Sequence, residues 1–102
     1  MIKNASIAQE FTPIISGSSA GSANVGLYFC NISASPETIT LYALPSGEAP
    51  SNDNTIIKNL PIHSEDTFYF GEEKFILGEG EIIGASSLVG GRVTATATSI
   101  DI

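Results

Sequence analysis

Few side chains in this sequence could carry catalytic chemistry, and the single histidine, His63, is the first to consider. It follows an apolar segment ending at Ile62 and precedes Ser64-Glu65-Asp66, where a solvated turn residue is the ordinary expectation. A Ser/His/Asp arrangement for hydrolysis could be built from His63. We assign no nucleophile elbow of the Gly-x-Ser-x-Gly kind, so we predict no catalytic residue and no enzyme. A small hydrolase that uses His63 is kept as the third hypothesis.

Acidic residues are the second group with chemical potential, because carboxylate oxygens are the ligands that Ca²⁺ prefers. A short stretch relieved only by Lys74 contains Glu65, Asp66, Glu72, Glu73, Glu79 and Glu81. The Asp-x-Asp-x-Asp spacing of a calcium loop does not occur in it. Acids in turns commonly stay solvated and keep sheet edges from pairing. We therefore predict no metal site and no cofactor, and leave open whether Ca²⁺ binds.

The tyrosines Tyr28, Tyr42 and Tyr69 could stack on sugars or face a partner. A β-sandwich also packs tyrosine rings against its core with the hydroxyl groups in water, and we expect that role here. Together with the turn-rich segment Pro45–Asn54, the longest expected loop, they motivate a carbohydrate-binding module as the alternative function. The chain has no tryptophan, the side chain that sugar-binding platforms favour.

The charge balance argues against other classes of partner. Eleven acids stand against four basic residues, a formal net charge of −7, so no surface can offer the run of cations that nucleic-acid binding needs. No apolar run approaches the ~20 residues of a membrane helix, and Met1–Ser16 lacks the pattern of a signal peptide. The lone Cys30 lies in the apolar run Val25–Ile32, which predicts a buried, inert thiol. We expect synthesis in a reducing cytoplasm.

The elements that must position these side chains all read as strands. Turn formers recur at short intervals, and the segments between them alternate β-branched and aromatic residues with a period of two. This pattern predicts one domain, residues 1–102, with an all-β fold: an antiparallel β-sandwich, Ig-like or jelly-roll-like, of about seven or eight strands. The expected strands are Ile7–Ile15, Ala23–Ile32, Glu37–Leu44, Thr55–Ile62, Thr67–Phe70, a short piece with Phe75 and Leu77, Gly80–Ser87 and Arg92–Ile102.

Local features of the pattern lead to further expectations. Pro13 indicates that the first strand lies at a sheet edge, because proline has no N–H to donate to a neighbouring strand. Ser16–Ser22 reads as a flexible loop that tolerates substitution. Both faces of Ala23–Ile32 are apolar, which predicts a central strand covered on two sides. Across the turn Ser33–Pro36, this strand is expected to form a hairpin with Glu37–Leu44.

The stretch from Val25 to Asp101 resembles a small β-sandwich found among structural proteins of tailed bacteriophages. The residues that carry the resemblance are Leu27-Tyr28-Phe29-Cys30-Asn31, Thr38-Ile39-Thr40-Leu41-Tyr42, Pro45-Ser46-Gly47, Asn54-Thr55-Ile56-Ile57-Lys58 and Gly78-Glu79-Gly80-Glu81-Ile82-Ile83. The resemblance implies a capsid decoration, neck or tail component that acts by repeated contacts with symmetry copies. It carries over no catalytic residue.

The leading hypothesis is a non-enzymatic virion structural protein of a tailed phage, a capsid decoration or cement protein or another neck or tail component. Its partners would be other virion proteins and copies of itself in a homo-oligomer, with no nucleic acid and no membrane. It would be made in the host cytoplasm and act in the virion. Only 15% of the residues are charged, which suits a surface that neighbouring molecules cover.

Overall fold

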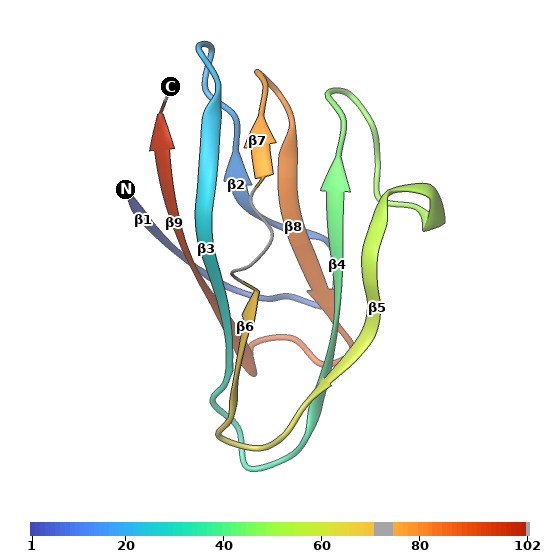
Figure 1. The fold of residues 1–102 in the computed structure, drawn as a ribbon. Helices are drawn as coiled ribbons and strands as arrows, with labels where there is room; N and C mark the ends of the chain where they lie inside the picture. The colour runs from blue at the N-terminus through green and yellow to red at the C-terminus, as the bar shows by residue number, and fades with distance from the viewer. Residues whose placement is uncertain (71–74, 102) are drawn as a thin grey trace.

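The computed structural model describes residues 1–70 and 75–101, which form two antiparallel sheets packed face to face (Figure 1). The strands are β1 (Ile2–Ser6), β2 (Thr12–Ser16), β3 (Ser22–Asn31), β4 (Glu37–Leu44), β5 (Thr55–Ile62), β6 (Thr67–Phe70), β7 (Phe75–Leu77), β8 (Ile82–Ser87) and β9 (Val93–Asp101), and a short 3₁₀ helix, η1 (Asn52–Asn54), precedes β5. No helix in this part of the chain is long and apolar enough to span a membrane. The predicted antiparallel β-sandwich is confirmed.

The strands form four nested antiparallel pairs: β4 with β5, β3 with β6, β2 with β8 and β1 with β9. The chain therefore follows the path of one long hairpin that is rolled up. The first sheet has the order β1-β9-β3-β6, with β7 also paired to β3, and the second sheet has the order β2-β8-β4-β5. Eight strands connected in this way form a jelly roll, one of the two sandwich types that the sequence predicts.

The core lies between the sheets and takes one face of each strand. In the first sheet, Leu27 and Phe29 of β3 lie opposite Ala97 and Ala95 of β9, and all four side chains are buried. Leu41 of β4 is part of the contribution of the second sheet. Small alanines beside large side chains let the two layers interdigitate at close packing.

The predicted strand Ile7–Ile15 is wrong, because the chain changes sheets inside it. β1 ends at Ser6 in the first sheet and β2 begins at Thr12 in the second, with a bend at Gln9-Glu10 between them. The Ala8 N–H donates to the Thr12 hydroxyl at 2.9 Å and closes this bend. A threonine that satisfies a backbone donor competes with strand continuation, which period-two alternation does not reveal.

The β2 strand and the loop after it give one confirmed prediction and one correction. Pro13 lies on an edge strand, as predicted, at a bulge in the pairing with β8. The predicted loop Ser16–Ser22 is not free at its ends, because Ser22 already belongs to β3 and its hydroxyl donates to Asp101 at 2.9 Å. A Cβ at Gly17 would overlap the backbone of the turn before β8. The expected tolerance to substitution does not extend to Gly17.

The predicted hairpin of Ala23–Ile32 with Glu37–Leu44 is also wrong. β3 lies in the first sheet and β4 in the second, so the connection between them crosses the sandwich. Asn31, fully buried, fixes this crossing: its amide donates to the carbonyls of Ser35 at 2.8 Å and Ile62 at 3.0 Å. A buried amide whose hydrogen bonds are met specifies one geometry for the turn.

An ion pair closes the same end of the sandwich. Glu37 opens β4 and is only 5% exposed, and its Oε1 accepts a hydrogen bond from Nη1 of Arg92 at 3.0 Å. Arg92 directly precedes β9, so the pair connects the two sheets. Because a buried carboxylate without a partner is costly, this contact holds the sheets in one relative position.

Candidate functional site

His63 lies in the exposed turn between β5 and β6, as predicted. In the described part of the chain, no hydroxyl or carboxylate is hydrogen-bonded to its imidazole. The motif assignment needs a correction, because Gly17-Ser18-Ser19-Ala20-Gly21 does match Gly-x-Ser-x-Gly. These residues join two strands, without the strand-to-helix context of a nucleophile elbow. They precede β3 while His63 lies past its other end, roughly 30 Å away for a strand of this length (Figure 1).

The acidic stretch is divided among separate turns. Glu72 and Glu73 lie outside the described residues, and within them no three acids, histidines or cysteines converge on a possible metal position. Glu81 instead serves its own turn, since its Oε1 accepts a hydrogen bond from the Gly78 N–H at 2.6 Å. Glu81 therefore stabilises a turn, although its residue type also suits a metal ligand.

The tyrosines do not share one platform, and core packing is the wrong prediction for two of them. Tyr28 on β3 and Tyr69 on β6 are 42% and 51% exposed and stack on each other, with ring centroids 4.5 Å apart. Tyr42 lies on the second sheet, edge-on to Phe11. The long loop Pro45–Asn54 also leaves from the second sheet. The features that motivate a carbohydrate-binding module are therefore divided between two layers.

The stacked tyrosines belong to a continuous surface on the outside of the first sheet, which we call the open face. Along each strand its side chains alternate with core residues, because successive side chains point to opposite sides of a sheet. The expectation that β3 is covered on two sides is thus wrong for its outer side. The open face consists of Ile2, Asn4 and Ser6 of β1; Thr94, Thr96, Thr98 and Ile100 of β9; Ala23, Gly26, Tyr28 and Cys30 of β3; Thr67 and Tyr69 of β6; and Ile76 of β7.

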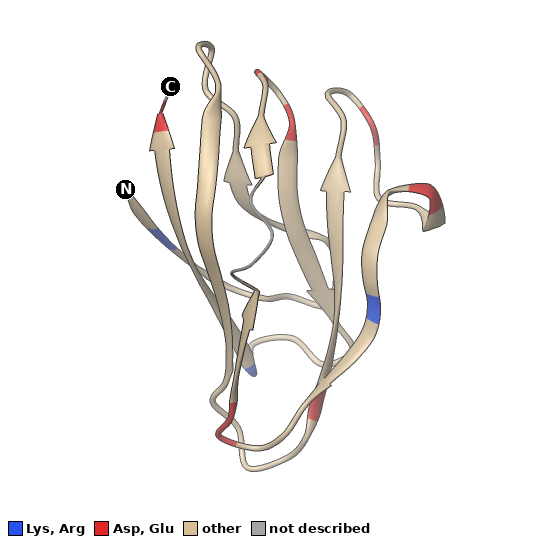
Figure 2. Cartoon of the chain, viewed as in Figure 1, with Lys and Arg blue, Asp and Glu red and all other residues tan. Residues whose placement is uncertain are grey.

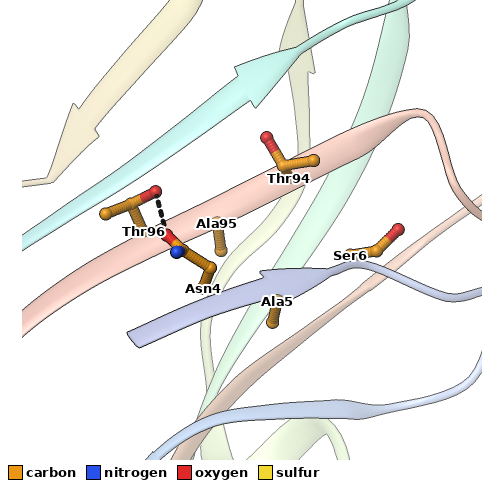
Figure 3. A pocket seen from close by; sticks show the side chains of 6 residues that line it. All are labelled: Asn4, Ala5, Ser6, Thr94, Ala95 and Thr96. Atoms are coloured by element: carbon orange, nitrogen blue, oxygen red, sulfur yellow. Dashed lines mark hydrogen bonds between the residues drawn. The ribbon is translucent and has the colours of Figure 1, made fainter. Parts of the chain in front are cut away.

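One row of this face crosses four strands. Asn4, Thr96, Tyr28 and Tyr69 are register partners in turn, and the Thr96 hydroxyl donates to Oδ1 of Asn4 at 2.9 Å (Figure 3). A shallow depression of about 370 Å³ lies over β1 and β9, lined by Asn4, Ala5, Ser6, Thr94, Ala95 and Thr96. Its hydroxyl, amide and methyl groups can make neutral hydrogen bonds and apolar contacts.

Gly26 is a buried position beside the tyrosine pair. A Cβ at this position would lie 3.1 Å from the Thr98 hydroxyl oxygen and 3.8 to 3.9 Å from the two tyrosine rings. The strand bulges between Asn24 and Gly26. The buried amide of Asn24 holds this bulge when its nitrogen is assigned to the side that faces the carbonyls of Gly26 and Thr98, each at 3.0 Å. The core thus fixes the shape of a site on the outer surface.

Charge is segregated away from the open face, none of whose residues is acidic or basic. Figure 2 shows β3 without a charged residue along its length and β9 without one before Asp101, while acids gather in turns and at strand ends. Cys30, predicted to be buried, is a half-buried free thiol on this same face. In a chain of net charge −7, so extended an uncharged area with exposed isoleucines is the distinctive surface of the described residues.

Sequence reasoning found the alternation that creates this face but not the face itself. Thr94, Thr96 and Thr98 alternate with buried residues of β9 in the printed sequence. Their position beside Tyr28 depends on the pairing of β9 with β3, which is a contact between distant segments. No known protein family matches the chain, and comparison with curated proteins and with solved structures found no match either.

Proposed function

We propose that this protein is a non-enzymatic structural component of a tailed-phage particle, a capsid decoration or another neck or tail part, and that it contacts neighbouring virion proteins through the open face. The observation that carries the contact is the segregation of charge. The resemblance in the segment Val25–Asp101 supplies the class of particle. The protein acts by repeated association, without chemistry on a substrate.

Electrostatics supports the open face as the contact surface. Copies that each carry a net charge of −7 repel one another and stay soluble before assembly. Contact then occurs at least cost where no charge has to be stripped of water. The exposed Ile100 and Ile76 and the tyrosine pair add apolar area to such a contact, with hydroxyl groups between them for neutral hydrogen bonds. The partner that fits is an uncharged, flat protein surface.

The jelly roll is compatible with this proposal but does not distinguish it from other functions. The fold serves viral capsid proteins and also lectins and cupins. Function has to be argued from the site, and the site here is a surface instead of a catalytic cleft. A glycan array is the direct comparison with the alternative: saturable binding of a sugar, lost in Tyr69→Ala, would replace assembly by carbohydrate recognition.

A charge placed on the open face tests the proposal. We expect Tyr69→Asp to reduce association with purified particles at least about tenfold, because a carboxylate would be desolvated in the contact. Tyr69→Phe keeps the ring and is expected to keep association. Ala49→Asp puts the same charge in the exposed β4–β5 loop as a matched control. Cosedimentation with particles, and mass spectrometry of purified virions, give the readout.

The outcomes separate the parts of the proposal. Loss of association only with Ala49→Asp would move the contact to the loop. Absence of the protein from purified virions, together with a strictly monomeric state, would overturn the structural role itself.

A further inference from the structure

We propose that β1 is a pairing edge, at which a second copy of the chain adds its own β1 in antiparallel orientation and makes the two first sheets continuous. The inference rests on the proposed function, because it names one partner and one geometry for the repeated contacts. An unpaired strand edge is a template for another strand, and folded proteins normally block it.

The edges of the second sheet carry the usual protection. β2 contains Pro13 and a bulge, and β5 contains Pro61, two irregularities in its pairing with β4 and a left-handed residue, Asn59, with φ of 55°. Proline removes a donor, and bulges twist an edge away from a flat partner. In the first sheet, the edge opposite β1 is formed by the short strands β6 and β7.

β1 has no proline, no bulge and no left-handed residue, and its one protective feature is the charge of Lys3. Its residues Ile2–Ser6 include no proline, and each one has a partner in β9 without any register shift. A strand with such a regular register can pair on its second side as it pairs on its first. β1 is thus the most regular edge among the described strands, with Lys3 as its one charged residue.

The backbone groups that point away from β9 can be identified from the hydrogen bonds at the two ends of β1. The Ser99 N–H donates to the Met1 carbonyl and the Ile7 N–H donates to the Val93 carbonyl, both at 2.9 Å. Hydrogen-bonded and non-bonded pairs alternate along an antiparallel ladder. Residues 3 and 5 therefore also bond to β9, and residues 2, 4 and 6 direct their N–H and carbonyl groups outward.

A two-fold axis at Asn4 matches these outward groups with their own copies. Asn4 then faces Asn4 of the second copy, and Ile2 faces Ser6, which gives three pairs that each exchange two hydrogen bonds. The register also places Lys3 opposite the small Ala5 of the second copy. A shift by two residues in one direction would set Lys3 against Lys3, and in the other would lose bonded pairs, so this register is favoured.

The consequence for the proposed function is a doubled open face. Sheet pairing across β1 would place the rows of Asn4, Thr96, Tyr28 and Tyr69 from two copies on one continuous surface. Since β1 has no acid, the junction brings no carboxylates together. A larger uncharged surface with two-fold symmetry would then meet the neighbouring virion protein.

Proline scanning of the edge tests the pairing. Asn4→Pro removes an outward N–H that β9 does not use, so the monomer should fold while the dimer Kd rises about 30-fold or more. Asn4→Ala keeps the outward N–H and is expected to keep the dimer. Sedimentation equilibrium of the full chain measures both, and circular dichroism checks that each variant is folded. A wild-type dimer that Asn4→Pro leaves intact would overturn the inference.

Cysteine cross-linking tests the register, in a Cys30→Ser background. With Asn4→Cys, the two introduced thiols would sit on paired residues, where Cα atoms are about 5.5 Å apart, within the range of a disulfide. With Ile2→Cys, the two thiols would be offset by roughly 13 Å and should not join. We expect a covalent dimer from the first variant alone on mild oxidation. Equal cross-linking in both variants, or none in either, contradicts the register.

The failure of this inference is distinguishable from the failure of the proposed function. A chain that stays monomeric but still associates with virions through Tyr69 would overturn the β1 edge and leave the structural role intact. A dimer that forms through β1 but is absent from virions would do the opposite.

Discussion

Each sheet of this jelly roll has a buried glycine on its outer side beside an aromatic pair. The two glycines differ in how closely other residues cover them. On the second sheet, a Cβ at Gly84 would meet the Phe11 ring and would lie 2.5 Å from the Thr12 carbonyl oxygen. Phe11 itself lies edge-on to Tyr42, with ring centroids 5.8 Å apart. The chain therefore covers this glycine with its own ring. On the first sheet, Gly26 is also buried, but a Cβ there would meet only side chains, with the Thr98 hydroxyl oxygen the nearest at 3.1 Å.

The outer side of the second sheet is covered by the chain itself near its glycine. The segment between β1 and β2 folds over Gly84, so the second sheet has an internal lid. In the described chain, no such segment covers Tyr28 and Tyr69, which are 42% and 51% exposed. A partner is the remaining way to cover apolar area of this kind, which is the basis of the proposed contact.

A substitution in the core should lower the free energy of unfolding more than any substitution on either outer surface. Leu41 is 1% exposed in the core beneath the second sheet, and Leu41→Ala should lower the free energy of unfolding by about 2 to 5 kcal/mol. Phe68 packs against the core but is only partly buried, so Phe68→Ala should cost less. Urea denaturation at fixed protein concentration measures both. A change below about 1 kcal/mol for Leu41→Ala would contradict its place in the core.

Gly84→Ala tests whether the second sheet covers its glycine as closely as the structure indicates. The added methyl group has no space between Phe11 and the β2 backbone, and we expect a loss of about 1 to 3 kcal/mol in unfolding free energy. Denaturation of Gly84→Ala in a Phe11→Ala background shows whether the ring causes the loss. If removing the ring does not lower the cost, the contact with the Thr12 carbonyl is the cause instead.

Tyr28→Ala should separate stability from association. Tyr28 is half-exposed and loses mainly its stacking with Tyr69, so the expected loss is about 1 kcal/mol in unfolding free energy. Association with particles should fall far more, by at least about tenfold, since aromatic anchors dominate protein contacts. Equal fractional losses in both measurements would show that the tyrosine pair serves the fold alone.

The smallest expected effect is that of Gly26→Ala. Only the Thr98 hydroxyl is close to the added methyl group, and that side chain can rotate, so unfolding free energy should change by less than about 1 kcal/mol. A loss as large as that of Gly84→Ala would show that Gly26 is covered as closely as Gly84. The two variants can be compared in the same thermal melt.

Much of the fold could be predicted from local alternation, but the two surfaces could not. The repeated threonines of β9 correctly mark one side as outer and the alanines as core. The sheet change at Ala8–Thr12 depends on a local hydrogen bond between a backbone N–H and a side chain, and the one at Asn31 depends on a hydrogen bond to the distant Ile62 carbonyl. Alternation encodes neither. For the same reason, Tyr28 and Tyr69 look like core residues in the sequence, and only cross-strand pairing reveals that they share an exposed side.

The place of β9 in the first sheet has a consequence for biosynthesis. This strand lies between β1 and β3, yet it is the last of the described strands to leave the ribosome. Until it emerges, β1 and β3 have no strand between them, and their N–H and carbonyl groups on that side are hydrogen-bonded to water. The first sheet therefore closes only after translation has passed Asp101, whereas β4 and β5 can pair while synthesis continues.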